Sequence, residues 1–268
     1  MNGVAVYRDV FRYRELFANL FRRDLQAKYR GSALGVLWTI VNPIMLMGVY
    51  LLVFSVVLKA RFANVPHYPL FLLSGLAVWT FFAAAFQSAT RSMLDNASLI
   101  RKIRFPRQLV PLSVVGAHLV SFAAMLVLLL VLNAVVLPRA RATELLAIPL
   151  AVLVVALVAG LALAAASLNV LFRDVEFIVA ALLVPWFFLT PIIYPLTSGT
   201  LAHHKHVIAA IHWVNPLSPA VEAIRAPLFL GRLPFWGDAL YLVVAALVAL
   251  ALGAFVFSRV DDQIAIEV

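Results

Sequence analysis

The sequence predicts an all-α integral membrane protein with six transmembrane helices. Hydrophobic residues make up 65% of its 268 residues and charged residues only 12%, whereas a soluble domain averages about 45–50% and about 25%. The apolar residues also gather into runs long enough to cross a bilayer, which takes about 20 residues per helix. A soluble core could not hide this much apolar surface, so the composition excludes other classes of protein.

The charged residues are mostly basic, and the net charge is +9. Because the basic residues flank the apolar runs, we interpret them as loops facing anionic lipid and expect no nucleic-acid partner. The first apolar run begins beyond residue 30 and is longer than the core of a signal peptide, so we expect it to stay in the mature protein. The chain has no cysteine, which excludes disulfides and thiolate metal sites.

Residues 1–32 are expected to form a cytoplasmic amphipathic interface helix. Between residues 8 and 26, apolar side chains recur three and four positions apart, and basic and polar side chains take the opposite face. Such a helix lies in the plane of the lipid headgroups, and packing on a partner protein is the alternative. Asp24 falls on the apolar side, where we expect it to pair with Lys28, four residues later.

Residues 33–268 are expected to form a six-span transmembrane domain. Asn42 and Pro43 interrupt its first span, and the proline frees a backbone carbonyl that neighbouring groups must satisfy. The apolar stretch Leu145–Leu189 is too long for one crossing, and its charged interruption at residues 173–176 divides it into two. The expected spans are Leu34–Leu58, Pro69–Met93, Leu109–Leu137, Leu145–Val170, Phe177–Tyr194 and Ala239–Phe257.

The region 195–236 does not fit a simple span. Its two apolar pieces, Val207–Val214 and Ala220–Leu230, are each too short to cross, and lipid does not tolerate exposed irregular backbone. We therefore expect re-entrant or interfacial helices. Fourteen Lys and Arg residues lie in segments on the side of the N-terminus and seven lie opposite. This bias predicts that both termini are cytoplasmic and that 195–236 faces outward.

Reactive groups are scarce in the expected membrane interior. His118 is the one ionisable residue that we place between span ends, and such a histidine is more often a hydrogen-bonded packing residue. An ion-coupled carrier needs intramembrane carboxylates and a membrane-embedded glycan enzyme needs converging catalytic groups, whereas the carboxylates here lie at span edges or in loops. His203, His204 and His206 suit a plain loop better than a metal site. We expect no catalytic and no metal-binding residue.

The sequence has no G-x-x-x-x-G-K-[ST] phosphate loop. ATP-driven transport would therefore need a second polypeptide to bind ATP and magnesium, and we expect this chain to bind no cofactor. Two expected cytoplasmic segments suit contact with such a subunit: Ser98–Arg107, a short helix with an apolar stripe, and Asn169–Glu176, a turn between two spans. The alternative is that both are loops that only set the topology.

Several short motifs together resemble a known family. The chain carries K-Y-R-G-S-A-L-G-V-L-W from Lys28, N-P at Asn42, I-R-K-I-R-F-P-R from Ile100, L-N-V-L-F-R-D-V from Leu168, T-P-I-I-Y-P from Thr190 and N-P-L-S-P from Asn215. In this order, over nearly the whole chain, they resemble the permease subunits of ATP-binding-cassette exporters of polysaccharides, which export lipid-linked O-antigens, teichoic acids and capsules. Each motif is moderately specific, and their combination is much more so.

The resemblance implies a complex of two permeases and two ATPase subunits, in which the permease pair encloses a continuous channel. It also implies six spans with an N-terminal interface helix and outward re-entrant helices, the layout that hydropathy and charge predict. The first ATPase contact would be a coupling helix with Leu99, Ile100, Arg101, Ile103 and Arg104. The second would be formed by Phe172, Arg173, Asp174 and Glu176.

The large aromatic residues are candidates for lining the channel. An aromatic ring can cover the flat C–H face of a sugar, and a sliding polymer needs many weak contacts. For any single ring, packing against lipid or at the interface is the alternative. The candidates are Trp38, Tyr50, Phe54, Trp79, Phe82, Phe86, Trp186, Phe187 and Tyr194.

We therefore expect a homodimeric membrane subunit of an exporter of a lipid-linked polysaccharide, in the cytoplasmic membrane of a bacterium. An exporter of a small lipid or drug from the same superfamily is the alternative. Basic residues near a membrane surface attract anions, so the lipid pyrophosphate headgroup is expected near Arg22, Arg23, Lys28 and Arg30. The alternative is that the interface helices only anchor the dimer.

Overall fold

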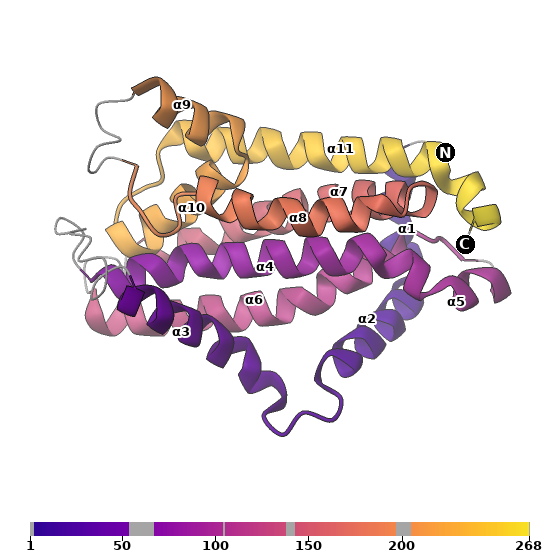
Figure 1. Ribbon diagram of the computed structural model, residues 1–268, viewed down its shortest axis with the longest axis horizontal. Coiled ribbons are helices and arrows are strands. Elements are labelled where there is room, and N and C mark those ends of the chain that lie inside the picture. Colours follow the sequence, from indigo (N-terminus) through magenta and orange to yellow (C-terminus); the bar gives the residue numbers. More distant parts are fainter. Residues whose placement is uncertain (1–2, 54–66, 104, 138–142, 197–204, 268) are drawn as a thin grey trace.

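The computed structural model describes residues 3–53, 67–103, 105–137, 143–196 and 205–267, which are helices joined by turns, with no strand among them (Figure 1). The N- and C-termini and the short helix α5 lie at one end of the bundle, called here the termini end. The opposite end, which carries α9 and α10, is called the far end. Four long helices run between the two ends: α4 (Tyr68–Asp95), α6 (Leu109–Val136), α7 (Ala147–Leu171, after the short turn η4, Glu144–Leu146) and α11 (Trp236–Glu267).

These four helices are long and apolar enough to cross a membrane. They confirm that the second, third, fourth and sixth expected spans are helical. The helices at the first and fifth expected spans, α3 (Trp38–Leu51) and α8 (Asp174–Leu189), are shorter, and residues 54–58 of the first span lie outside the described residues. The count of six therefore remains a prediction.

The region before α11 folds as expected into two short helical pieces. Helix α9 (Lys205–Val214) is followed by α10 (Leu217–Arg225), which continues into the π-helical turn η6 (Ala226–Leu230). The two pieces meet at a bend of 91°, which makes them a broken span or a re-entrant loop. If the pair is one span, up to five described segments cross.

The expected N-terminal interface helix is two helices, α1 (Gly3–Arg12) and α2 (Arg14–Tyr29). They part at Tyr13, whose φ of −106° and ψ of 35° are not helical. After α2 the chain turns through η1 (Gly35–Leu37) into α3, so that α2 and α3 form a V whose apex stands away from the bundle (Figure 1).

The expected pairing of Asp24 with Lys28 is wrong. The Asp24 carboxylate accepts hydrogen bonds from Arg23 Nη2 at 2.7 Å and from Ser113 Oγ at 2.7 Å, while Lys28 turns to Ser121 on α6. Because α2 packs on α6, hydroxyl groups of α6 lie within reach, and these tertiary contacts replace the local pair.

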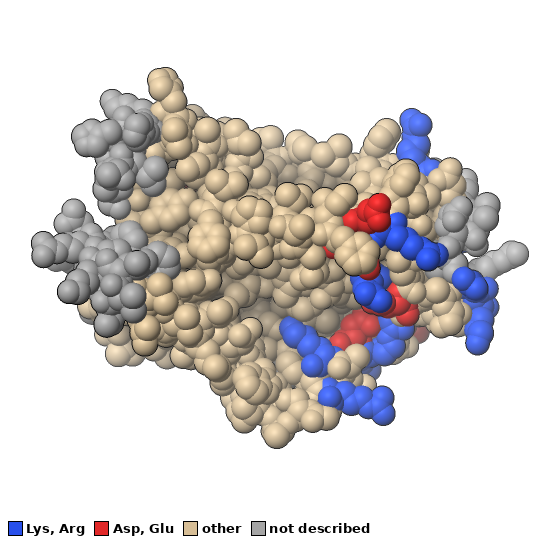
Figure 2. Space-filling view, viewed as in Figure 1, with Lys and Arg blue, Asp and Glu red and all other residues tan. Residues whose placement is uncertain are grey.

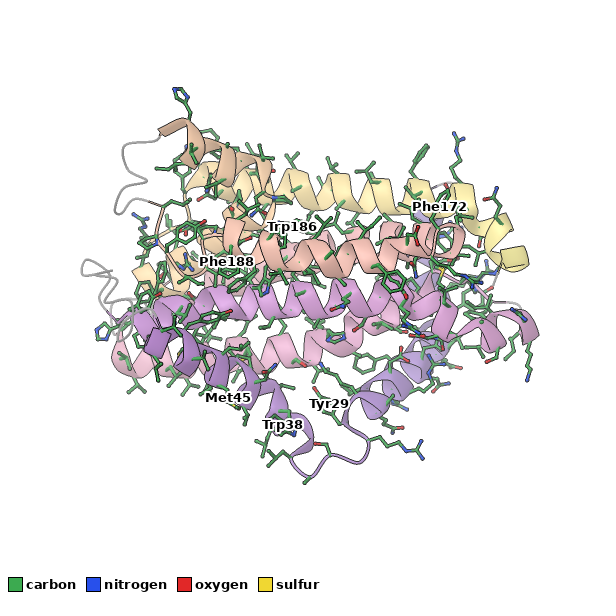
Figure 3. All side chains as sticks on the ribbon, in the orientation of Figure 1. Tyr29, Trp38, Met45, Phe172, Trp186 and Phe188 are labelled. Carbon is green, nitrogen blue, oxygen red and sulfur yellow. The ribbon has the colours of Figure 1, made fainter. Side chains whose placement is uncertain are left out.

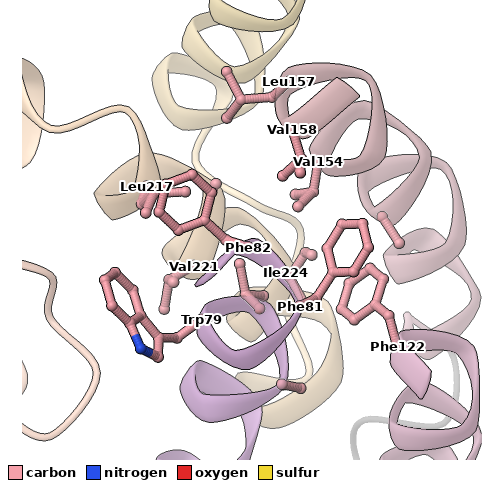
Figure 4. Close-up of a cluster of buried hydrophobic side chains, with 14 of the residues drawn as sticks. Trp79, Phe81, Phe82, Phe122, Val154, Leu157, Val158, Leu217, Val221 and Ile224 are labelled. Atoms are coloured by element: carbon pink, nitrogen blue, oxygen red, sulfur yellow. The ribbon is translucent and has the colours of Figure 1, made fainter. Parts of the chain in front are cut away.

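The hydrophobic core is built around α4, which buries more of its length than the other three long helices. Phe81 of α4 stacks on Phe122 of α6 with ring centroids 4.6 Å apart. From the far end, Leu217, Val221 and Ile224 of α10 enter the same core (Figure 4). The short helix α10 is therefore part of the bundle interior, and this placement determines the surroundings of every charged residue that it carries.

Candidate functional site

The apolar stripe of α5 (Ala97–Lys102), the expected coupling helix, divides into a buried and an exposed part. Ile100 is buried in a cluster with Met93 and Phe257, whereas Ile103, just after the helix, is 54% exposed. Leu99 lies between these extremes, Arg101 is exposed, and Arg104 lies outside the described residues. Ile103 is therefore the most exposed apolar side chain of this segment.

The second expected contact, the turn between α7 and α8, presents an exposed Phe172 beside exposed Arg173 and Asp174 (Figure 3). The start of α8 is fixed by Asn169, whose side-chain oxygen accepts a hydrogen bond from the backbone N–H of Glu176 at 3.0 Å. A separate contact connects this turn with α4.

Arg91 of α4 lies between the two expected contact segments. Its Nε is 3.0 Å from Asp95, just before α5, and its Nη1 is 3.7 Å from Glu176, at the start of α8. The three residues therefore bring both segments together at the termini end. Figure 2 shows the Lys, Arg, Asp and Glu side chains of this face gathered at the same end.

A polar cluster joins α2 to α6 beside the V. Lys28 Nζ donates to Ser121 Oγ at 2.7 Å and lies 3.2 Å from His118 Nδ1, and the Tyr29 hydroxyl is 3.1 Å from the same Ser121 oxygen. The expected lone histidine is thus a hydrogen-bonded residue. Lys28 is accessible, but protein atoms around its ammonium remove hydration, which lowers the pKa of Lys28 from 10.5 to about 8.

The other three residues expected at the lipid headgroup do not belong to this polar cluster. Arg22, Arg23 and Arg30 are exposed, and Arg23 is occupied by an ion pair with Asp24 at 2.7 Å. Lys28 is the one of the four whose charge sits at the junction of two cavities.

Three cavities follow one another along α4. A termini-end cavity of about 820 Å³ lies between α2, α4, α5 and α6, and a middle cavity of about 330 Å³ lies between α2, α3, α4 and α6. A groove of about 430 Å³ lies between α3, α4 and α8. The first two cavities share Lys28 and His118, and the second shares Asn42, Thr80 and Ala84 with the groove. The three cavities therefore lie in a row, with Lys28 at the first two and the aromatic groove at the other end.

Six of the nine candidate channel aromatics form one connected cluster beside that groove. Phe187 stacks on Tyr50 at 5.5 Å and meets Trp79 edge-on at 5.3 Å. Phe82 contacts Trp79 at 5.6 Å, Phe86 at 5.3 Å and Trp186 at 5.0 Å. The rings thus come from α3, α4 and α8, which the sequence alone does not bring together.

The burial of these rings differs. Phe82 is fully buried and Trp79 is 9% exposed, whereas Phe188, which the sequence reasoning did not select, is 55% exposed on the groove. Trp38 stands across the V from Tyr29 and lines the middle cavity (Figure 3). Tyr194 donates its hydroxyl to the Phe188 carbonyl at 3.0 Å, and Phe54 lies outside the described residues.

Sequence reasoning also missed the charged groups of the far end. Arg225, counted from sequence among the seven basic residues of the outward-facing segments, is fully buried. His212 of α9 and Asp238 of α11 form a partly buried pair at 2.7 Å. The available signal was the position of Arg225 inside the apolar piece 220–230. No group of His, Asp and Glu in the described part of the chain is arranged to hold a metal ion, and His203 and His204 lie outside that part.

Comparison with known proteins identifies similar chains. The family model described as ABC-2 type transporter matches residues 15–229. An O-antigen export system permease protein RfbA of Myxococcus xanthus is 33% identical over 263 residues, which cover 98% of each chain. Two proteins of the same description from Klebsiella pneumoniae are 32% and 31% identical over 181 residues, which cover 67% of this chain and 69% of theirs.

Proposed function

Because this chain belongs to the ABC-2 type transporter family, we propose that it is the membrane subunit of an exporter of a lipid-linked, O-antigen-like polysaccharide. Its relatives are described as O-antigen export permeases, which supports this choice of substrate. ATP and magnesium bind to a separate ATP-binding-cassette ATPase in this proposal. The chain works as a homodimer in the bacterial inner membrane with both termini in the cytoplasm.

The observation that carries the proposal is the succession of cavities from Lys28 to the aromatic groove. A lipid-linked polysaccharide has an anionic phosphate end and a long hydroxylated chain, so it needs a cationic site followed by a surface for sugars. Lys28 provides an ammonium that hydrogen bonds to Ser121 and His118 hold in place. The middle cavity lies between this ammonium and the groove, and Asn42, Thr80 and Ala84 line both the middle cavity and the groove.

The groove combines rings with polar groups, as sugar binding requires. Tyr50, Trp79, Phe187 and Phe188 supply aromatic surface, and Gln87 adds an amide. Aromatic stacking tolerates varied units, as it does for bases on single-strand nucleic-acid binders, and a polymer must be released as readily as it is bound. A second protomer facing this groove would complete the channel.

The termini-end segments supply the proposed contact with the ATPase. Exposed Ile103 and Phe172 are apolar groups beside charged residues at the end that gathers the charges. Arg91 contacts Asp95, just before the first segment, and Glu176, the last residue of the second, so we expect a displacement of one segment to shift the other.

The test is transport by the purified complex in proteoliposomes, with lipid-linked polysaccharide as substrate. Tyr50→Ala combined with Phe188→Ala removes two groove rings that are not fully buried. A stacking contact is worth about 1–3 kcal/mol, so export of long polymer should slow about fivefold or more while ATP hydrolysis continues. Trp236→Ala removes an exposed indole outside the groove, and any defect should appear as a lower yield of complex.

Undiminished export of long polymer by the double variant would refute the sliding surface. Transport of the lipid carrier without sugars at the rate of the full substrate would favour the alternative, an exporter of small lipids.

A further inference from the structure

Arg225, the last residue of α10, is 0% exposed. A charged residue inside a membrane protein is costly, and it usually faces a partner and has a function. Here every N–H group of the guanidinium is directed at an acceptor. The partners are the Pro191 carbonyl at 3.0 Å and Glu222 Oε1 at 2.6 Å for Nη1, the Ile192 carbonyl at 3.3 Å and the Phe71 carbonyl at 3.5 Å for Nη2, and Ser74 Oγ at 3.4 Å for Nε.

These partners belong to three separate parts of the fold. Phe71 and Ser74 lie in the first turns of α4, Pro191 and Ile192 directly follow α8, and Glu222 lies one turn earlier in α10. The guanidinium also stands 3.7 Å from the centre of the Phe71 ring. Arg225 therefore joins the far end of α4, the end of α8 and the re-entrant pair at one point.

Gly75 makes room for this junction. A Cβ at Gly75 would lie 2.7 Å from Arg225 Nη2 and 3.2 Å from the Ile192 Cα, so any side chain there would push the guanidinium or the loop away. Beside it, the Tyr68 hydroxyl donates to the Ile193 carbonyl at 2.7 Å. Three successive carbonyls after α8 are thus held by donors from α10 and α4.

Helix α8 itself is packed lightly between its two ends. Its buried side chains are Val179, Leu183 and Phe187. Its start is fixed by Asn169 and by Arg91 of α4. At the other end of α8, Asn215 accepts a hydrogen bond from Trp186 at 2.8 Å and donates one to Thr190 at 2.9 Å. Because Asn215 lies between α9 and α10, these bonds attach the end of α8 to the bend of the re-entrant pair. Arg225 extends that attachment to α4.

We propose that Arg225 is a positioning residue that locks the end of α8 to α4 and α10, so that a displacement of α8 at the termini end reaches the aromatic groove. The inference rests on the proposed export function, because Phe187 and Phe188 of α8 line that groove. The planar guanidinium with five donors suits this place, and a lysine ammonium with three donors does not reproduce it.

Because the chain has no cysteine, an introduced disulfide can replace the contacts by which Arg225 joins the end of α8 to α4. In Gly75→Cys/Ile192→Cys/Arg225→Ala, the space of the guanidinium is free, and the two thiols come within the reach of a disulfide, whose Cβ atoms are about 3.5–4.5 Å apart. The purified complex is oxidised with copper phenanthroline or reduced with dithiothreitol in proteoliposomes. Polymer transport and ATP hydrolysis are then measured on the same sample.

The oxidised variant should transport within threefold of the unmodified complex. The reduced variant should transport at least tenfold more slowly and still hydrolyse ATP within twofold, which is a split that a loss of folding does not produce. Arg225→Lys should transport polymer at a rate between those of the oxidised and the reduced triple variant. Arg232→Ala, which changes an exposed arginine of the same region, should behave as the unmodified protein.

Equal transport in the oxidised and reduced states would overturn the inference. Failure of the single variant Arg225→Ala to assemble would also overturn it, because Arg225 would then serve folding alone. A failure of the proposed function looks different, since the unmodified complex would then transport no polysaccharide at all.

Discussion

Gly160 of α7 and Gly253 of α11 lie against each other where these two helices pack. A Cβ at Gly160 would overlap the backbone of Ala249, and a Cβ at Gly253 would overlap the backbone of Gly160. Small residues at a membrane helix interface allow this close approach of two backbones. The pair holds the last helix, which carries the C-terminus, against the bundle.

The first prediction concerns this contact. Gly160→Ala should destabilise the protein by about 1–3 kcal/mol, the usual cost of overpacking, because the obstacle is backbone that cannot rotate away. Thermal unfolding in detergent measures the effect. Gly48→Ala is the matched control, since nothing lies within 4 Å of a Cβ at that helical glycine. Equal melting temperatures for both variants would contradict the packing.

The second prediction separates the two isoleucines of the coupling segment. Ile103→Asp places a charge on an exposed residue, so stability should change by about 0.5 kcal/mol or less, while the ATPase should no longer co-purify because the charge would be buried in an apolar contact. Ile100→Ala should instead destabilise the chain by about 2–5 kcal/mol. If Ile103→Asp leaves export and co-purification intact, the segment only sets the topology.

The third prediction concerns the pH dependence of headgroup binding. The pKa of Lys28 is lowered to about 8 in the free protein, and a bound phosphate raises it. Affinity should therefore decline as the pH rises through about 8, where binding must also take up a proton. The charged or titratable residues that line the same cavities are Tyr29, His118, Arg23, Asp24, Asp95 and Lys102.

The assay for this prediction is binding of a short polyprenyl diphosphate to the protein in nanodiscs. A charge-assisted hydrogen bond is worth about 1.5–3 kcal/mol, so Lys28→Gln should weaken binding about tenfold or more and remove the decline above pH 8. Lys28→Arg should bind without that decline. Arg30→Gln, which changes an exposed residue, is the control. The same pH profile in Lys28→Gln and the unmodified protein would exclude Lys28 as the headgroup ligand.

The fourth prediction concerns topology. Ser98→Cys and Gln263→Cys, both exposed at the termini end, should resist a membrane-impermeant maleimide in intact spheroplasts and react after permeabilisation. Arg232→Cys, after η6, should react in both. Labelling of Ser98→Cys from outside would place α5 away from the ATPase and refute its role in coupling.

Properties that depend only on hydropathy and on the length of apolar runs could be predicted from the sequence. Four of the six expected spans are long apolar helices, because a run of apolar residues meets the thickness of a bilayer whatever its neighbours are. The bent pair before α11 follows from two runs that are each too short to cross. Local reasoning also predicts that α5 and the start of α8 contact a partner, and that assignment stays a prediction.

The surroundings of each side chain were decided by the tertiary structure. Helices α7 and α8 are apolar on all sides, so no periodicity tells which face is covered, and only packing separates buried Phe187 from exposed Phe188. Lys28 meets Ser121 across 93 residues, which is why its local pairing with Asp24 was a wrong expectation. Arg225 was counted as an outward-facing charge because hydropathy assigns no partners. It is buried because carbonyls from α4 and from the end of α8 converge on it, and that convergence exists only once the helices have packed.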